Sequence, residues 1–297
     1  MGLLGVLWYQ SMVIAVASVG FSVASRPSDV SHLYLEKSFP QALHDCMQYL
    51  QVPPSRYEEY QALNFPNDPQ TRCLVRCVGL NLRWWNDTTG VHTSVIANFF
   101  RPDPTDVHYE RATKECVEHR LKPTPANPTL QDCCLRAYNT FECYLQNYGN
   151  LVYSPQYYPE DRSRQVQVSY DCINILQVSK PLLQLFTEDS VPEDPGTQCL
   201  GRCFFLRLGL YDEERGFDLR RLYTRDYVTP NKRYLSKETY DKLCAIRLTS
   251  PDQCTEVNRA YFGVIKELET SFHSLSIAHE AARKALSDGS TCAALEP

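Results

Sequence analysis

Cysteine is the residue whose spacing in this 297-residue chain carries the most chemical information, and all 13 cysteines follow residue 45. Cys73 and Cys77 are four residues apart, so on a helix they face one side on successive turns and can join that helix to two neighbours. Zinc sites use Cys-x-x-Cys pairs or a nearby His pair instead. The spacing therefore favours disulfides, and the odd count leaves at least one cysteine that offers a contact for dimerisation.

The N-terminus supports an oxidising compartment. Residues 1–25 contain no charged side chain, and the apolar run Met12–Ala24 ends in small residues before Arg26. We expect a signal peptide at 1–25, although an uncleaved membrane anchor is the alternative. No later segment is apolar enough to span a bilayer, so we expect a secreted, extracellular protein with no membrane contact after cleavage. The sequon at Asn86 is a candidate glycosylation site.

Composition and motifs argue against several functions. The net charge is −5, and no cluster of Lys and Arg is present to bind nucleic acid. The run DCCLRAYNTFECY resembles the Cys-Cys helix of secreted phospholipases, but Ala137 and Tyr138 occupy the positions of the required His and Asp. No metal-protease, hydrolase-elbow or phosphate-loop motif occurs. We therefore expect no enzyme activity, catalytic residue, metal site or cofactor.

The chain contains an internal repeat. Cys46, Cys73 and Cys77 recur at an offset of 126 residues as Cys172, Cys199 and Cys203, and several neighbouring identities keep that offset. Later cysteines shift slightly, with Cys116 matching Cys244 and Cys134 matching Cys254. We therefore expect a first domain at 26–150, a linker at 151–164 and a second domain at 165–297.

Helical patterns dominate both repeats. Asp68-Pro69 is a helix-start signal before the run that contains Cys73, and its copy follows Asp194-Pro195. Residues 272–286 predict an amphipathic terminal helix, whereas alternating strand patterns are nearly absent. The fold class is thus predicted to be all-α, with two tandem disulfide-stapled helical domains. Four tyrosines near the linker (Tyr148, Tyr153, Tyr157, Tyr158) either pack at the domain seam or form dityrosine crosslinks.

The spacing Cys46-x26-Cys73-x3-Cys77-x38-Cys116-x17-Cys134-x8-Cys143 resembles the insect odorant-binding protein family, also called the pheromone/general odorant-binding family. The resemblance implies the pairs Cys46–Cys77, Cys73–Cys134 and Cys116–Cys143, with Cys133 surplus. In the second repeat it implies Cys172–Cys203 and Cys199–Cys254. Gly263 replaces the sixth cysteine, so Cys244 pairs with Cys292, unless Cys292 joins Cys133 instead.

The resemblance implies a carrier of small hydrophobic ligands such as odorants or lipids. The tandem arrangement is similar to the atypical two-domain members of mosquitoes and to the salivary scavengers of blood-feeding flies, which implies capture of eicosanoids or biogenic amines as an alternative. A structural eggshell or matrix protein on the same fold is a further alternative. Disulfides worth about 2–4 kcal/mol each offset the cost of a dry pocket of at least ~300 Å³.

Candidate pocket walls are the apolar and aromatic residues that follow each stapled helix. In the first repeat they are Trp84, Trp85, Val91, Ile96, Phe99, Phe100, Tyr138 and Phe141. In the second repeat they are Phe204, Phe205, Leu208, Tyr211, Phe217, Leu222, Tyr223, Tyr261 and Phe262. Aromatic residues of this kind also fill ordinary cores.

Overall fold

The structure is a computed structural model that describes residues 36–122, 132–187 and 194–288. All of these residues belong to one compact unit, His32–Pro297. The predicted signal peptide and Cys292 lie outside the described residues. Within the described ranges, no helix has the length and apolar character needed to cross a membrane.

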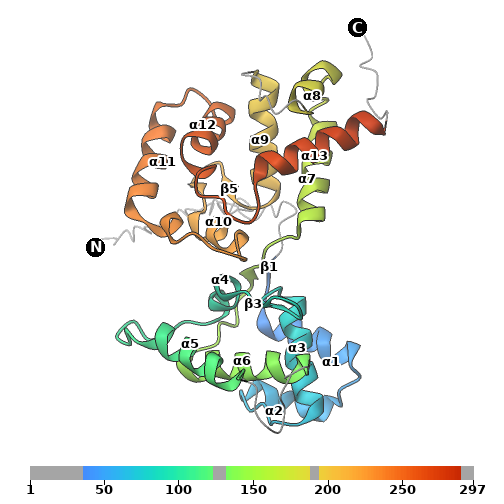
Figure 1. Cartoon of the computed structure of the whole chain (residues 1–297), viewed down its shortest axis with the longest axis vertical. Coiled ribbons are helices and arrows are strands. Elements are labelled where there is room, and N and C mark those ends of the chain that lie inside the picture. Colours follow the sequence, from blue (N-terminus) through green and yellow to red (C-terminus); the bar gives the residue numbers. More distant parts are fainter. Residues whose placement is uncertain (1–35, 123–131, 188–193, 289–297) are drawn as a thin grey trace, which may run out of the picture. The chain divides into compact units, whose positions relative to one another are not determined.

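The first repeat consists of short helices and one small hairpin (Figure 1). Its elements are α1 (Phe39–Tyr49), η1 (Pro54–Arg56), α2 (Tyr57–Gln61), α3 (Pro69–Asn81), β2 (Trp85–Asn86), β3 (Gly90–Val91), α4 (Thr93–Ile96), η2 (Ala97–Phe99), α5 (Tyr109–Arg120) and α6 (Cys133–Asn147). Strands β2 and β3 pair antiparallel, and Gly90 adopts a φ of +85° that favours glycine in this turn. α3 packs against both α1 and α6.

The second repeat has a similar order of helices and a hairpin, but it ends in the π-helical turn η4 and the additional helix α13. Its elements are α7 (Arg162–Ile175), α8 (Lys180–Thr187), α9 (Pro195–Arg207), β5 (Tyr211–Asp212), β6 (Gly216–Phe217), α10 (Leu219–Arg225), η3 (Lys232–Leu235), α11 (Lys237–Thr249), α12 (Gln253–Ala260), η4 (Tyr261–Ile265) and α13 (Ser274–Ser287). α9 packs against α12 and α7, and α13 packs along α7 and α8 (Figure 1). The all-α prediction is confirmed, because every strand in the described ranges is only two residues long.

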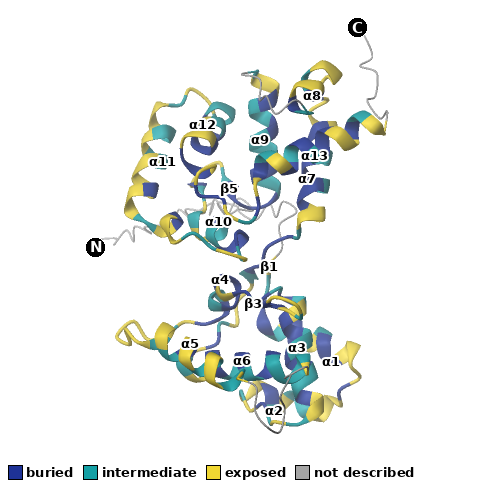
Figure 2. Ribbon diagram, in the orientation of Figure 1, coloured by how far each residue is buried: buried dark blue, intermediate teal, exposed yellow. Residues whose placement is uncertain are grey.

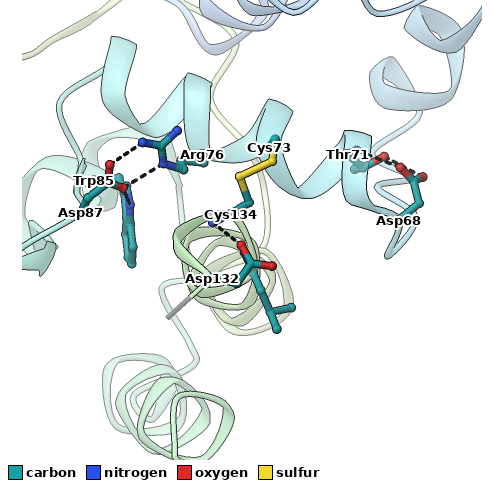
Figure 3. Close-up of a disulfide and its surroundings, with 9 residues drawn as sticks. Asp68, Thr71, Cys73, Arg76, Trp85, Asp87, Asp132 and Cys134 are labelled. Carbon is teal, nitrogen blue, oxygen red and sulfur yellow. Dashed lines mark hydrogen bonds and ion pairs between the residues drawn. A yellow bond between two sulfur atoms is a disulfide. The ribbon is translucent and has the colours of Figure 1, made fainter. Parts of the chain in front are cut away.

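Local sequence signals explain why the central helices begin where they do. The Asp68 carboxylate accepts a hydrogen bond from the backbone N–H of Thr71 at 2.9 Å and caps α3, while Asp194 caps α9 through Gly196. Figure 3 shows the cap of α3 on the same helix as Cys73. The predicted start signals at Asp68-Pro69 and Asp194-Pro195 are therefore confirmed.

An ion pair ties the central helix of each repeat to the following hairpin. Arg76 on α3 pairs with Asp87, which also accepts a hydrogen bond from Trp85 Nε1 at 3.0 Å (Figure 3). At the corresponding positions, 126 residues later, Arg202 pairs with Glu213. The two repeats thus share this contact as well as their helix caps.

Five disulfides staple the described helices. In the first repeat they are Cys46–Cys77, Cys73–Cys134 and Cys116–Cys143, and in the second repeat Cys172–Cys203 and Cys199–Cys254. Figure 3 shows Cys73 and Cys134 joining α3 to α6. Cys244 forms no disulfide with another described cysteine, and because Cys292 is not described, their pairing stays a prediction. Cys133 belongs to none of the five described disulfides.

Each repeat has its own hydrophobic core (Figure 2). The first core gathers around Phe39, Leu74 and Phe141, and the second around Leu200, Phe204 and Ile277. The linker carries β4 (Gln156–Tyr157), which pairs with β1 (Glu36–Lys37). Of the four tyrosines near the linker only Tyr153 is exposed, so their placement fits packing better than crosslinking.

Candidate ligand pocket

A small apolar pocket lies inside the second repeat, among α7, α8, α9, α12, η4 and α13. Its volume is about 60 Å³, well below the ~300 Å³ expected from the sequence. The larger apolar residues that line it are Phe186, Leu200, Phe204, Phe205, Val257, Tyr261, Phe262, Leu275 and Ala278. Small or polar residues complete the wall: Ser169, Thr197, Gly201, Asn258 and Ser274.

The pocket lies where the second repeat has smaller side chains than the first. Ser169 and Gly201 correspond, at the offset of 126, to Leu43 and Val75, which are both buried in the first core. Asn258 corresponds to Tyr138 at the offset of 120 set by Cys134 and Cys254. These three positions lie on three different helices and all line the pocket. Removing side-chain volume at packed positions leaves space unless neighbours move in.

In the first repeat, two tryptophans occupy the space beside the central helix. Trp84 and Trp85 are almost completely buried, and a Cβ added to Gly79 on α3 would lie 2.6 Å from Cβ of Trp85. The second repeat has Phe205 at the position of Gly79, and Leu210 and Tyr211 follow it in place of the tryptophans. The large side chains therefore lie at the start of the hairpin in the first repeat, whereas the second repeat has a large side chain on the central helix.

The helix that closes the pocket is interrupted. In the first repeat α6 is continuous over 15 residues and is held by Cys143, whereas α12 spans eight residues and passes into the π-helical turn η4. Gly263 lies in η4 at the position of Cys143. Phe262, beside it, lines the pocket and is 37% exposed. Because π-helical turns are rare and frequently mark functional sites, η4 is a candidate entrance.

A buried polar network borders the pocket. Arg225 on α10 donates from Nη1 to Glu269 Oε1 at 3.0 Å, and both side chains are at most 3% exposed. Glu269 also accepts hydrogen bonds from the hydroxyls of Tyr261 and Ser274, which both line the pocket. Gln165 Oε1 accepts from Arg225 Nε at 2.9 Å. Burial raises the pKa of Tyr261, so its hydroxyl stays protonated as a donor.

Of the pocket residues expected from the sequence, four line this pocket: Phe204, Phe205, Tyr261 and Phe262. Leu208, Tyr211 and Leu222 are buried in the second core, and Phe217 packs against it. In the first repeat Trp84, Trp85, Ile96, Phe99, Tyr138 and Phe141 form the core. The predicted sequon residue Asn86 is exposed on β2.

Val91, Phe100 and Tyr223 line a wider, open hollow of about 660 Å³. Its wall also carries five charged side chains, Glu110, Lys114, Glu118, Arg220 and Lys232. A second open hollow of about 670 Å³ surrounds Tyr57 and the α1–η1 loop. Sites for apolar ligands are mostly apolar with few polar groups, which fits the pocket of the second repeat better than the charged hollow.

Comparison with known proteins gives consistent matches. The profile of the PBP/GOBP family matches residues 32–147 and again residues 156–261. General odorant-binding protein 69 of Anopheles gambiae is 29% identical over 188 residues, which cover 61% of this chain and 80% of that protein. Odorant-binding protein 22 of Aedes aegypti is 26% identical over 140 residues, which cover 47% and 88%.

Among solved structures, the crystal structure of Anopheles gambiae odorant-binding protein 22a is 30% identical to this chain. The match covers 36% of this chain and 96% of that one, with a TM-score of 0.30. Another structure of the same protein contains the bound odorant cyclohexanone.

Proposed function

Because the chain belongs to the PBP/GOBP family and both repeats match its profile, we propose that it carries small hydrophobic ligands in the pocket of its second repeat. The observation that carries this proposal is the apolar pocket beneath η4, formed where three core positions are smaller than in the first repeat.

The pocket must widen to accept a ligand, since about 60 Å³ holds little more than a few atoms. Phe262 is the side chain to move, because it is partly exposed and lies in the π-helical turn. The second repeat also has no disulfide between α11 and η4 where the first repeat has Cys116–Cys143. Segments with little buried apolar area open locally at low free-energy cost, and in α11 only Thr239 is buried (Figure 2).

We also propose that the protein is secreted and acts outside the cell. Five described disulfides require an oxidising compartment to form and persist. The uncharged, apolar N-terminal 25 residues supply a fitting signal peptide. N-terminal sequencing of protein from insect-cell medium should begin at Arg26, and retention of the intact chain in cell membranes would contradict this.

A fluorescence assay with N-phenyl-1-naphthylamine tests the carrier function. Gly201 lines the pocket, and a Cβ added there would meet only Val257 Cγ1, at 3.8 Å. Gly201→Leu should therefore fill the pocket without a backbone clash and abolish probe binding. Glu115→Leu adds the same side chain to the exposed side of α5 and should leave binding unchanged.

Two results would count against the proposal. Failure of the correctly disulfide-bonded wild-type protein to bind the probe or any compound of a broad odorant and lipid panel would overturn the carrier function. Equal probe binding by the wild type and Gly201→Leu would show that the probe binds outside this pocket.

A further inference from the structure

We propose that the pocket of the second repeat selects neutral ligands that donate a hydrogen bond, such as alcohols and phenols, over ketones and ethers of the same size. This inference rests on the carrier function proposed above and specifies its ligand class. It follows from where the hydroxyl protons of Tyr261 and Ser274 point.

The hydroxyl protons of Tyr261 and Ser274, two residues of the pocket wall, are already committed. Tyr261 donates to Glu269 Oε2 at 3.1 Å, and Ser274 donates to Glu269 Oε1. A carboxylate can only accept hydrogen bonds, so these donors have no alternative direction that preserves the contact. The two hydroxyls therefore cannot donate to a ligand without breaking a buried, charge-assisted hydrogen bond.

Each hydroxyl oxygen retains accepting capacity. The oxygen of Tyr261 accepts one hydrogen bond, from the backbone N–H of Leu275 at 3.1 Å. The oxygen of Ser274 accepts one, from Arg225 Nη1 at 3.0 Å. A hydroxyl oxygen has two lone pairs, so one on each remains for a ligand O–H. A ketone or ether could accept a hydrogen bond from neither of these two hydroxyls, which leaves Ser169 and Asn258 as the wall residues that could donate to it.

Charge argues against an amine as the favoured donor. An ammonium ligand would need a carboxylate, but Glu269 is already paired with Arg225 in a nearly solvent-free site. The Arg225 guanidinium, bonded to Ser274 itself, would repel a second cation nearby. Among the described residues Arg225 Nη2 has no hydrogen-bond partner, so an anionic ligand is the competing occupant. However, Arg225 does not line the pocket, and Ser274 does.

The polar network is specific to the second repeat. Gln165 and Arg225 correspond to Phe39 and Phe99 at the offset of 126, and Tyr261 corresponds to Phe141 at the offset of 120. In the first repeat these three phenylalanines are buried, and Phe39 stacks on Phe141 at 5.4 Å. A buried ion pair adds little stability over an apolar core of the same volume, so stability alone does not account for the exchange.

Competition against N-phenyl-1-naphthylamine with a matched cyclic series tests the inference on the full-length, disulfide-bonded protein. The series is cyclohexanol, cyclohexanone, the isomeric cyclic ether oxepane, cyclohexylamine and cyclohexanecarboxylate. Cyclohexanol should bind roughly three- to tenfold more tightly than the ketone and the ether, which is the effect of one net hydrogen bond. Tyr261→Phe removes one of the two accepting oxygens and should lower this ratio, while Ser274 keeps the other.

Tyr60→Phe is the matched control, because it removes a buried tyrosine hydroxyl of the first repeat that bonds to Thr71 at 3.1 Å. Its cyclohexanol preference should equal that of the wild type. If Tyr261→Phe does not fold, the wild-type series decides alone, because cyclohexanone has as many heavy atoms as cyclohexanol and lacks the donor.

Equal affinity for alcohol, ketone and ether would overturn the inference and leave the carrier function standing. Tightest binding of cyclohexanecarboxylate would also overturn it and would identify Arg225 as the recognition group. Tightest binding of cyclohexylamine would also overturn it, because the Arg225 guanidinium should disfavour a cationic ligand. Failure of the wild type to bind the probe at all would overturn the carrier function itself.

Discussion

The two repeats share a scaffold but differ in what fills it. Both have an aspartate cap on the central helix, an ion pair from that helix to the hairpin, and disulfides from it to two neighbours. The first core is filled by aromatic rings, whereas the second contains an ion pair, a small pocket and an interrupted closing helix. Duplication has thus left one copy with the packed interior and the other with the features of a binding site.

The pocket results from differences between the two repeats at several positions. No single substitution creates it, because Leu43, Val75 and Tyr138 of the first repeat are replaced on three separate helices. The third disulfide is lost beside the same pocket, where Gly263 lies in η4. The first repeat therefore has both the third disulfide and the densely packed core. The second repeat lacks a disulfide at η4 and has the pocket there.

The largest expected effect is on the ion pair that distinguishes the second core. Glu269→Gln leaves the Arg225 cation buried without a counter-charge, which should destabilise the second repeat by about 3–5 kcal/mol. Peptide-resolved hydrogen exchange should show faster exchange in α7 and α13 and no change in α1 and α3. The double variant Arg225→Met/Glu269→Met should recover most of the stability. Unchanged exchange in Glu269→Gln would show that the pair is not buried as described.

Removing the third disulfide should make the first repeat resemble the second. The Cys116→Ser/Cys143→Ser variant opens a bridge across 27 residues, which should cost about 3 kcal/mol. Hydrogen exchange in α5 should then rise toward that of α11. Exchange in α5 that stays slow would mean that packing, and not the disulfide, holds this helix.

Emptying the matched core position should open the first repeat. Val75 is 1% exposed on α3, and Val75→Gly should destabilise the repeat by about 2 kcal/mol, from the cavity and from glycine in a helix. Thermal unfolding measures the loss of stability, and hydrogen exchange shows whether the loss lies in the first repeat. No loss would show that the first core repacks freely, which would undermine the size argument for the pocket.

The smallest effect concerns the ion pair of the first repeat's hairpin. The hydrogen bond from Arg76 lowers the pKa of Asp87 to about 2, although desolvation opposes it. The stabilisation is present above the ordinary aspartate value near 4 and is lost as pH falls through about 2. Because both side chains are about one-third exposed, Asp87→Asn should cost about 1 kcal/mol at pH 7.

Urea denaturation of the wild type and Asp87→Asn at several pH values checks this. The difference in unfolding free energy should be constant from pH 7 to 5 and shrink between about pH 4 and pH 2. A difference that does not change with pH would mean that the loss comes from the hydrogen bond to Trp85 and not from the charge.

The helices and repeats were predictable from the sequence because their signals are local. Asp68-Pro69 predicts the start of α3 from capping chemistry alone. The pocket was less predictable, since its space results from side-chain sizes on helices far apart in sequence. A search for aromatic residues found Phe204 and Tyr261 but missed Gly201 and Ser169. Comparing the repeats position by position would have found both, because each is smaller than its counterpart.

Native mass spectrometry of the secreted, disulfide-bonded protein with cyclohexanol tests the central claim most directly. We predict one bound ligand per chain, held in the second repeat, and loss of that ligand in Gly201→Leu. Two ligands per chain, or one ligand that Gly201→Leu still retains, would contradict the claim that the second repeat alone carries the binding site.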